Sequence, residues 1–113
     1  MGQYFIAVNE TKREYFSADD LGGYDKLWSW CAGHAAGLFP YLLRRSDAYS
    51  CGGDIDGETE YAGRWARDKV SLIGDYDSSG LYEQAQAKFT NIAAGLAEEY
   101  NEFIEDEEYQ LKK

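Results

Sequence analysis

The acidic segment in the middle of the chain holds the residues with the clearest capacity for chemistry. Asp54, Asp56 and Glu58 alternate with other residues around Gly57, so that carboxylate oxygens recur at every second position. Calcium loops begin in this way, although the later glycine and the distal glutamate of an EF-hand are absent in register. The spacing fits a solvated acidic turn and, as an alternative, a site for Ca²⁺ or Mg²⁺.

A hydrolase could use such a segment as its metal centre. Asp75 lies at the end of an expected strand, and paired carboxylates can hold a hard cation that activates water. We therefore keep a metal-dependent hydrolase, built from the acidic loop together with Asp75, as an alternative. A strand-end aspartate more often caps a turn, which is the simpler interpretation of this residue.

Cys31 and His34 form a second group that could act in catalysis, because they lie about one helical turn apart. A cysteine nucleophile needs a nearby imidazole and an orienting Asp or Asn. Both residues lie in a mostly apolar helical stripe beside Trp30, so we interpret them as packed core residues. The sequence contains no glycine-rich nucleotide motif, no H-E-x-x-H and no G-x-S-x-G. We therefore expect neither an enzyme nor a bound cofactor.

A second acidic segment follows near the C-terminal end of the sequence. Seven acids without an intervening base occupy positions 98 to 108: Glu98, Glu99, Glu102, Glu105, Asp106, Glu107 and Glu108. Carboxylates along a helix present negative charge to the lysines and arginines that would otherwise grip phosphates. The segment predicts a surface that imitates a nucleic-acid backbone, and the alternative is a solvated helix face.

The overall charge has the same sign as these two segments. The chain has 113 residues, with 21 Asp and Glu against 11 Lys and Arg and a formal net charge of −10. This length fits one domain spanning residues 1–113. The negative charge disfavours direct nucleic-acid binding and favours a protein partner with a basic surface. No apolar run is long enough for a membrane span, and two distant cysteines indicate a reduced, cytoplasmic protein.

Aromatic residues are abundant, with 3 Trp, 10 Tyr and 5 Phe. This is more aromatic surface than a domain of this size must bury, and aromatic groups rimmed by acids are typical of protein-binding patches. We assign Trp65 to such a patch. The alternative is core filling with scattered surface tyrosines.

The positions of these groups depend on an α+β fold. The expected strands are a hairpin at residues 3–16, a strand at 69–76 and a fourth strand at 61–66, forming one small antiparallel sheet; the expected helices are 25–36, 39–45, 81–88 and a long acidic helix at 89–104. Both faces of the first strand are apolar, which predicts a central place in the sheet or beneath a helix. The acids at the end of the last helix oppose its dipole, so we expect fraying after Ile104.

Six short stretches of the sequence form a pattern: Met1-Gly2-Gln3-Tyr4, Val8-Asn9, Lys12-Arg13-Glu14-Tyr15, Lys26-Leu27-Trp28, Gly63-Arg64-Trp65-Ala66-Arg67-Asp68-Lys69-Val70 and Ile73-Gly74-Asp75-Tyr76. In these stretches the chain resembles a family of small, functionally uncharacterised prokaryotic and phage proteins. The resemblance covers residues 1–78, and the pattern has glycine at the position of Arg67. It implies an α+β core and an origin on a mobile element, and it assigns no functional residue.

These observations lead to one expected function and two alternatives. We expect a non-enzymatic acidic binding protein that blocks a basic, nucleic-acid-binding surface of a bacterial complex, in the manner of a phage-encoded anti-CRISPR inhibitor acting in the host cytoplasm. The expected contact residues are Glu98, Glu99, Glu102, Glu105, Asp106, Asp54, Asp56, Glu58 and Trp65. The alternatives are the Ca²⁺ or Mg²⁺ site described above, with or without hydrolase activity, and an accessory subunit of a host complex.

Overall fold

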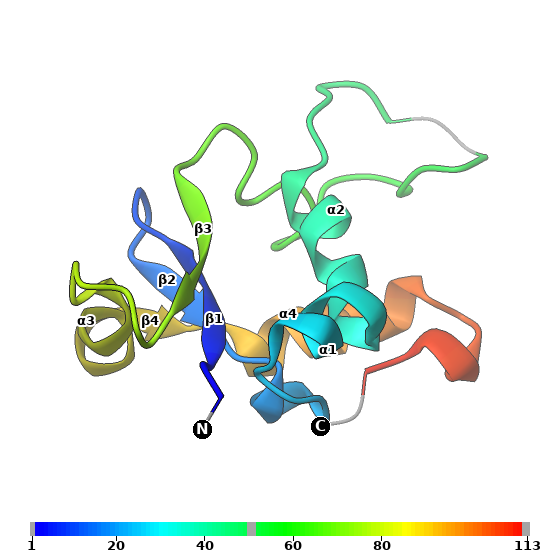
Figure 1. The fold of residues 1–113 in the computed structure, drawn as a ribbon. Coiled ribbons are helices and arrows are strands. Elements are labelled where there is room, and N and C mark those ends of the chain that lie inside the picture. Colours follow the sequence, from blue (N-terminus) through cyan, green and yellow to red (C-terminus); the bar gives the residue numbers. More distant parts are fainter. Residues whose placement is uncertain (1, 50–51, 112–113) are drawn as a thin grey trace.

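Two strands and then two helices open the chain, and strands and helices alternate after them (Figure 1). The structure is a computed structural model that describes residues 2–49 and 52–111, and this part contains four strands and four α-helices. The strands are β1 (Phe5–Asn9), β2 (Glu14–Phe16), β3 (Val70–Gly74) and β4 (Thr90–Asn91); the helices are α1 (Leu27–Ala32), α2 (Leu38–Leu43), α3 (Leu81–Lys88) and α4 (Ala93–Phe103). The predicted α+β class is confirmed.

Strand β1 lies in the interior of an open sheet with the order β3-β1-β2-β4. It pairs antiparallel with β2 and with β3, in a register that places Val8 opposite Tyr15 on one side and Ser71 on the other. The predicted hairpin and the predicted strand at 69–76 are therefore confirmed. So is the central position expected from the apolar groups on both faces of the first strand.

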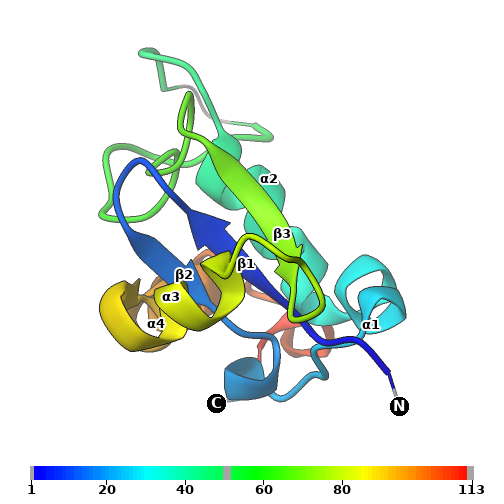
Figure 2. The same cartoon turned by 60° about the vertical axis from the view of Figure 1, so that its left-hand side comes forward.

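The two faces of β1 pack against different helices (Figures 1 and 2). On one face Ile6 and Val8 are fully buried against Ala85 of α3. On the other face Ala7 joins the larger core, which contains residues of α1, α2 and α4. Because apolar side chains point to both sides of the strand, helices are needed on both sides to exclude water.

The fourth strand was predicted in the wrong place. Residues 61–66 form turns, because the backbone amides of Gly63 and Trp65 donate to carbonyls at the end of α2. The fourth strand is instead β4, which pairs parallel to β2. The sheet is therefore mixed, and the expected all-antiparallel sheet is wrong.

Pairing of β4 also delays the start of the last helix. The backbone amides of Thr90 and Ile92 donate to carbonyl oxygens of Arg13 and Tyr15, at 2.9 and 3.0 Å, which holds the chain extended. The side chain of Asn91 then accepts from the amide of Ala93, where α4 begins. The helix expected from residue 89 is therefore only 11 residues long.

The predicted end of this helix near Ile104 is confirmed, but the following residues fold back on it. Phe103 is the last helical residue, and the amide nitrogen of the Gln110 side chain donates to the carbonyls of Asn101 and Ile104. The Asn101 side chain in turn exchanges two hydrogen bonds with the backbone of Leu111, which is buried. The expected frayed end is thus replaced by a cap made from the C-terminal segment.

The predicted pair of short helices before residue 45 is confirmed as α1 and α2, with a break between them. Gly33 is extended at the end of α1, and a short 3-10 turn covers His34–Gly37. This break turns the chain away from the regular helical stripe. Cys31 and His34 are consequently exposed, and their interpretation as packed core residues is wrong.

Candidate functional site

The two acidic segments of the sequence lie along one groove. Asp54 and Asp56 of the loop after α2, and Glu99, Glu102 and Glu105 at the end of α4, line a hollow of about 370 Å³. These segments are far apart in the sequence, and the fold brings them together. Carboxylates that seemed to form two separate surfaces therefore contribute to one acidic groove, the name used below for this hollow.

Glu99 holds the loop against the helix. Its carboxylate accepts hydrogen bonds from the backbone amides of Glu60, Tyr61 and Ala62, at 2.9 to 3.3 Å, and from the hydroxyl of Tyr41 at 2.6 Å. Burial and this contact with the Glu99 carboxylate raise the pKa of Tyr41 well above its usual range. Glu99 was predicted to bind a partner, but the structure assigns it an internal contact role.

Asp54 is also engaged within the protein. Both of its oxygens accept hydrogen bonds from the guanidinium of Arg44, at 2.6 and 2.9 Å. The same guanidinium donates to the carbonyls of Ser46 and Ala48, so it holds the segment that follows α2 in place. This bidentate pair neutralises the charge of Asp54 on its side of the groove.

The other predicted acids differ from these two in being exposed. The exposed carboxylates are Asp56, Glu58, Glu98, Glu102, Glu105 and Asp106. Asp56, Glu102 and Glu105 line the acidic groove, whereas Glu58, Glu98 and Asp106 lie outside its lining. The predicted acids therefore fall into three sets: Asp54 and Glu99 build the groove, Asp56, Glu102 and Glu105 carry its exposed charge, and the others lie outside it.

An apolar recess opens beside the acidic groove. It has a volume of about 350 Å³, and its lining includes Pro40, Tyr41, Ile55 and Phe103. Tyr41, Ile55 and Phe103 also line the acidic groove, so the two hollows adjoin each other. Phe103 is 43% exposed and lies against the Tyr41 ring, with 5.3 Å between ring centroids.

The sequence placed Phe103 in the buried stripe of the last helix and did not identify the recess. Its position next to the acids of α4 was the available signal, since the last turn of a helix often lies at the edge of a core. Ile55, in the middle of the acidic loop, was a second signal, because a lone apolar residue among acids usually anchors a loop.

Trp65 does not belong to a partner-binding surface. Its side chain is fully buried, with its ring centroid 5.5 Å from that of Phe16, and its indole nitrogen donates to Glu14 at 2.9 Å. The assignment of Trp65 as a contact residue is therefore wrong in this conformation. Exposed aromatic side chains instead include Tyr24 and Trp28, which are 64% and 67% exposed, with 6.4 Å between their ring centroids.

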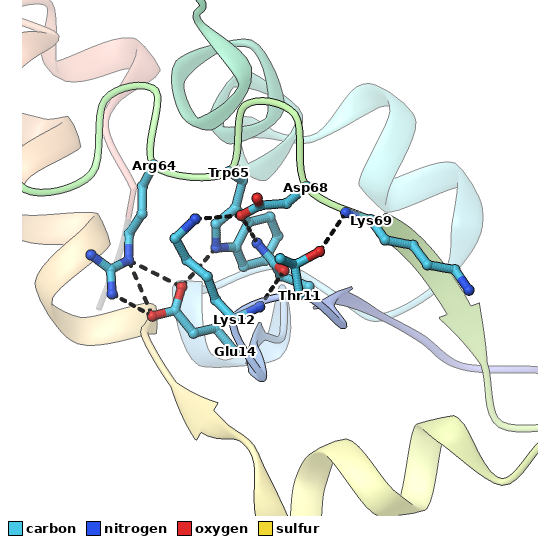
Figure 3. Close-up of polar contacts among 8 residues, drawn as sticks. Thr11, Lys12, Glu14, Arg64, Trp65, Asp68 and Lys69 are labelled. Carbon is cyan, nitrogen blue, oxygen red and sulfur yellow. Dashed lines mark hydrogen bonds and ion pairs between the residues drawn. The ribbon is translucent and has the colours of Figure 1, made fainter.

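Trp65 belongs to a second charged region, which we call the hairpin network (Figure 3). Glu14 accepts hydrogen bonds from Arg64 and Trp65, and Asp68 accepts from Asn9 and Lys12. Figure 3 shows these side chains converging from the β1–β2 hairpin and from the segment before β3. The distances lie between 2.5 and 3.1 Å.

Burial raises the pKa of Glu14. The hydrogen bonds from Arg64 and Trp65, together with the positive charge of Arg64, lower this pKa by a larger amount. The net pKa of Glu14 is below its usual value. Asp68 behaves in the same way, since burial raises its pKa and the hydrogen bonds from Lys12 and Asn9 lower it more. Both carboxylates are therefore stabilised as anions.

The residues of the hairpin network all lie in segments that carry the resemblance described above. Gly63 and Arg67 have φ angles of +76° and +70°, so the turn needs left-handed backbone on both sides of Trp65. A Cβ at position 63 would also lie 2.6 Å from the carbonyl oxygen of Arg44. Glycine adopts this conformation without strain, which gives a physical reason for glycine at the position of Arg67 in the resembled pattern.

The metal-site alternative requires several ligand side chains close together. Among residues 2–49 and 52–111, no three His, Cys, Asp or Glu side chains are grouped so that they could hold a metal ion. In the same part of the chain, Asp75 accepts a hydrogen bond from the backbone amide of Tyr4 at the sheet edge. The loop carboxylates and Asp75 therefore do not supply a ligand set for the metal-site alternative.

Comparison with known proteins gives no relative from which an activity could be transferred. No family model, curated protein or solved structure matches the chain. None of the helices in the described part has the length and hydropathy needed to cross a membrane.

Proposed function

We propose that this protein is a non-enzymatic binding protein whose acidic groove docks on a basic surface of a protein that handles nucleic acid. The observation that carries the proposal is that two acidic segments, distant in sequence, line one groove with Asp56, Glu102 and Glu105 exposed. In its most specific form, the proposal is a phage-encoded inhibitor of a bacterial defence complex, of the anti-CRISPR type.

The way the groove is built supports this proposal. Glu99 fixes the loop to α4 through three backbone amides, so the exposed carboxylates are presented on a constrained scaffold. Carboxylates held in place can face lysines and arginines that otherwise bind phosphates, and their counterions are released on binding. The formal net charge of −10 would also speed encounter with a basic partner at low salt.

The test compares two variants that remove the same amount of negative charge. Glu102→Gln with Glu105→Gln removes two of the exposed charges of the groove, whereas Glu83→Lys changes an exposed residue of α3, which packs on the other face of the sheet. Each protein is immobilised, incubated with bacterial lysate and washed with excess double-stranded DNA, and the released proteins are identified by mass spectrometry.

We expect wild type and the Glu83→Lys variant to retain a nucleic-acid-binding protein that DNA displaces. The groove variant should lose it. Capture of the same proteins by all three chains, or retention that DNA does not affect, would contradict the proposal. Glu99 is unsuitable for this charge test, because its loss would detach the loop from α4.

A further inference from the structure

The groove has a feature that imitation of a phosphate backbone does not require. A phosphate mimic needs carboxylates at suitable spacing, but here the acidic groove adjoins an apolar recess of about 350 Å³, with which it shares lining residues. Phe103 lines both hollows and is 43% exposed. Apolar surface left open to water is stabilised when a partner covers it.

The recess has a defined shape. Tyr41 and Ile55 form its wall and are almost completely buried, at 7% and 9% exposed. The Tyr41 hydroxyl is fixed by Glu99, and its ring meets Tyr100 edge-on at 5.4 Å between centroids. The recess is therefore held in place by the same contacts that hold the acidic loop.

Charge is distributed unevenly around the recess. On the loop side Arg44 pairs with Asp54 through two hydrogen bonds. On the α4 side Glu102 and Glu105 are exposed. A cationic group of a partner is thus attracted to Glu102 and Glu105, next to Phe103, and to the exposed Asp56 across the groove, whereas Asp54 is neutralised by its ion pair with Arg44.

Building on the proposed function, we propose that the partner enters this groove as a protein segment with one bulky apolar side chain flanked by lysines or arginines. The apolar side chain occupies the recess beside Phe103 and Ile55. The basic residues lie against Glu102 and Glu105, where charge complementarity favours them. This identifies the occupant as a basic peptide segment with an apolar anchor, rather than a uniformly basic surface.

Two synthetic peptides test this inference by fluorescence anisotropy. One has the sequence Lys-Arg-Lys-Leu-Lys-Arg-Lys, and the other has serine in place of leucine. Wild type should bind the leucine peptide about tenfold more tightly, which is a preference that anisotropy measures easily. Raising the salt from about 50 mM to about 300 mM should weaken both complexes, because the ion pairs are screened.

Four variants separate the apolar and the charged contributions. Phe103→Ala should abolish the preference for leucine and leave binding of the serine peptide unchanged. Tyr109→Ala is the matched control, because this exposed aromatic residue lies outside the groove lining. Glu102→Gln with Glu105→Gln should weaken both peptides while keeping the preference. Phe103→Leu retains an apolar side chain and should restore most of the preference for the leucine peptide. This result would show that Phe103→Ala loses the preference through the apolar contact and not through a general loss of folding.

The failure of this inference can be distinguished from failure of the proposed function. Equal binding of both peptides to wild type, lost in the Glu102 and Glu105 variant, would overturn the apolar anchor and leave the acidic docking surface intact. Binding of neither peptide above the level of that variant would overturn both. A preference for leucine that persists in Phe103→Ala would also overturn the assigned recess.

Discussion

The hairpin network and the acidic groove use the same residue types for different ends. In the network, Glu14 and Asp68 each meet specific donors and are at most slightly exposed. In the groove, Glu102 and Glu105 are exposed at the end of α4. The negative charge of the protein therefore comes from two kinds of carboxylate. Paired carboxylates join segments of the chain, and exposed carboxylates stay available to a partner.

The groove also contains both kinds of carboxylate. Glu99 and Asp54 accept several hydrogen bonds each and resemble the network residues more than their neighbours. Each of the two acidic segments therefore contains both paired and exposed carboxylates. Variants of the two kinds of carboxylate should separate effects on stability from effects on binding.

The largest effect is expected for Glu14→Ala. This change leaves the guanidinium of Arg64 and the buried indole N–H of Trp65 without their acceptor. Loss of one partner of a mostly buried pair destabilises a protein by about 2–4 kcal/mol. Urea unfolding measures the difference. Glu14→Gln keeps an acceptor for the indole and should lose less unfolding free energy. Equal stability of both variants and wild type would show that the Glu14 contacts do not stabilise the fold.

The next effect is expected for Glu99→Gln. The amide keeps one oxygen acceptor, but its NH₂ group now faces backbone amides that donate to Glu99 in the wild type. The expected loss is about 1–3 kcal/mol, the cost of unsatisfied donors. Local release of the loop is measured as faster hydrogen exchange at the amides of residues 60–62. Exchange as slow as in wild type would mean that Glu99 does not anchor the loop.

The pH dependence of stability tests the network as a whole. Because the pKa values of Glu14 and Asp68 are lowered in the folded state, their contribution is present above the unfolded pKa and is lost as the pH falls through the folded pKa. Asp25 acts in the opposite direction, since burial outweighs its hydrogen bonds and raises its pKa. Unfolding free energies are measured between about pH 7 and about pH 3.

The control for this experiment is the difference between wild type and Glu14→Gln. This difference should shrink as the pH falls, because protonation removes the same charge that the substitution removes. A constant difference over the whole pH range would show that the charge of Glu14 does not contribute to stability.

The sequence was sufficient for the elements whose patterns are local. The hairpin, the strand before residue 76 and the break between the first two helices follow from alternation, apolar runs and glycine positions. It was insufficient where a distant partner decides. Strand β4 exists because the carbonyls of Arg13 and Tyr15, in and just before β2, accept from Thr90 and Ile92, and no local pattern encodes that pairing.

The same limit applies to the site. The two acidic segments were found from composition, but their meeting in one groove depends on the hydrogen bonds from residues 60–62 to Glu99. The assignment of Trp65 was wrong because its burial depends on Glu14, about fifty positions away in the sequence, as an acceptor for its indole. Residue type indicated the chemistry, and tertiary contacts decided which groups remain exposed.

A smaller effect, of opposite sign, is expected within the network segment for Arg67→Gly. Arg67 is exposed and has a left-handed backbone, which strains a residue with a Cβ by about 1–2 kcal/mol. Replacement by glycine relieves this strain, but it also increases the conformational freedom of the unfolded chain. The two effects together give an expected net stabilisation of about 0.5–1 kcal/mol. Thermal unfolding measures it.

Arg13→Gly provides the comparison for this prediction. Arg13 has a similar φ of +58°, but its guanidinium lies over the ring of Phe89 at 4.7 Å. Its replacement removes that contact along with the strain, so it should gain less than Arg67→Gly. A larger gain at position 13 would mean that backbone conformation does not dominate at these two sites.

The smallest effect on stability is expected where the proposed effect on binding is largest. Neutralising Glu102 and Glu105 removes exposed charges whose like-signed neighbours repel them, so the unfolding free energy should stay within about 0.5 kcal/mol of wild type. Urea unfolding of the double variant and of Glu83→Lys should give nearly the same midpoint. A marked destabilisation of the groove variant alone would place these two carboxylates with Glu99 among the structural contacts, and exposed charge would then no longer distinguish the groove from the hairpin network.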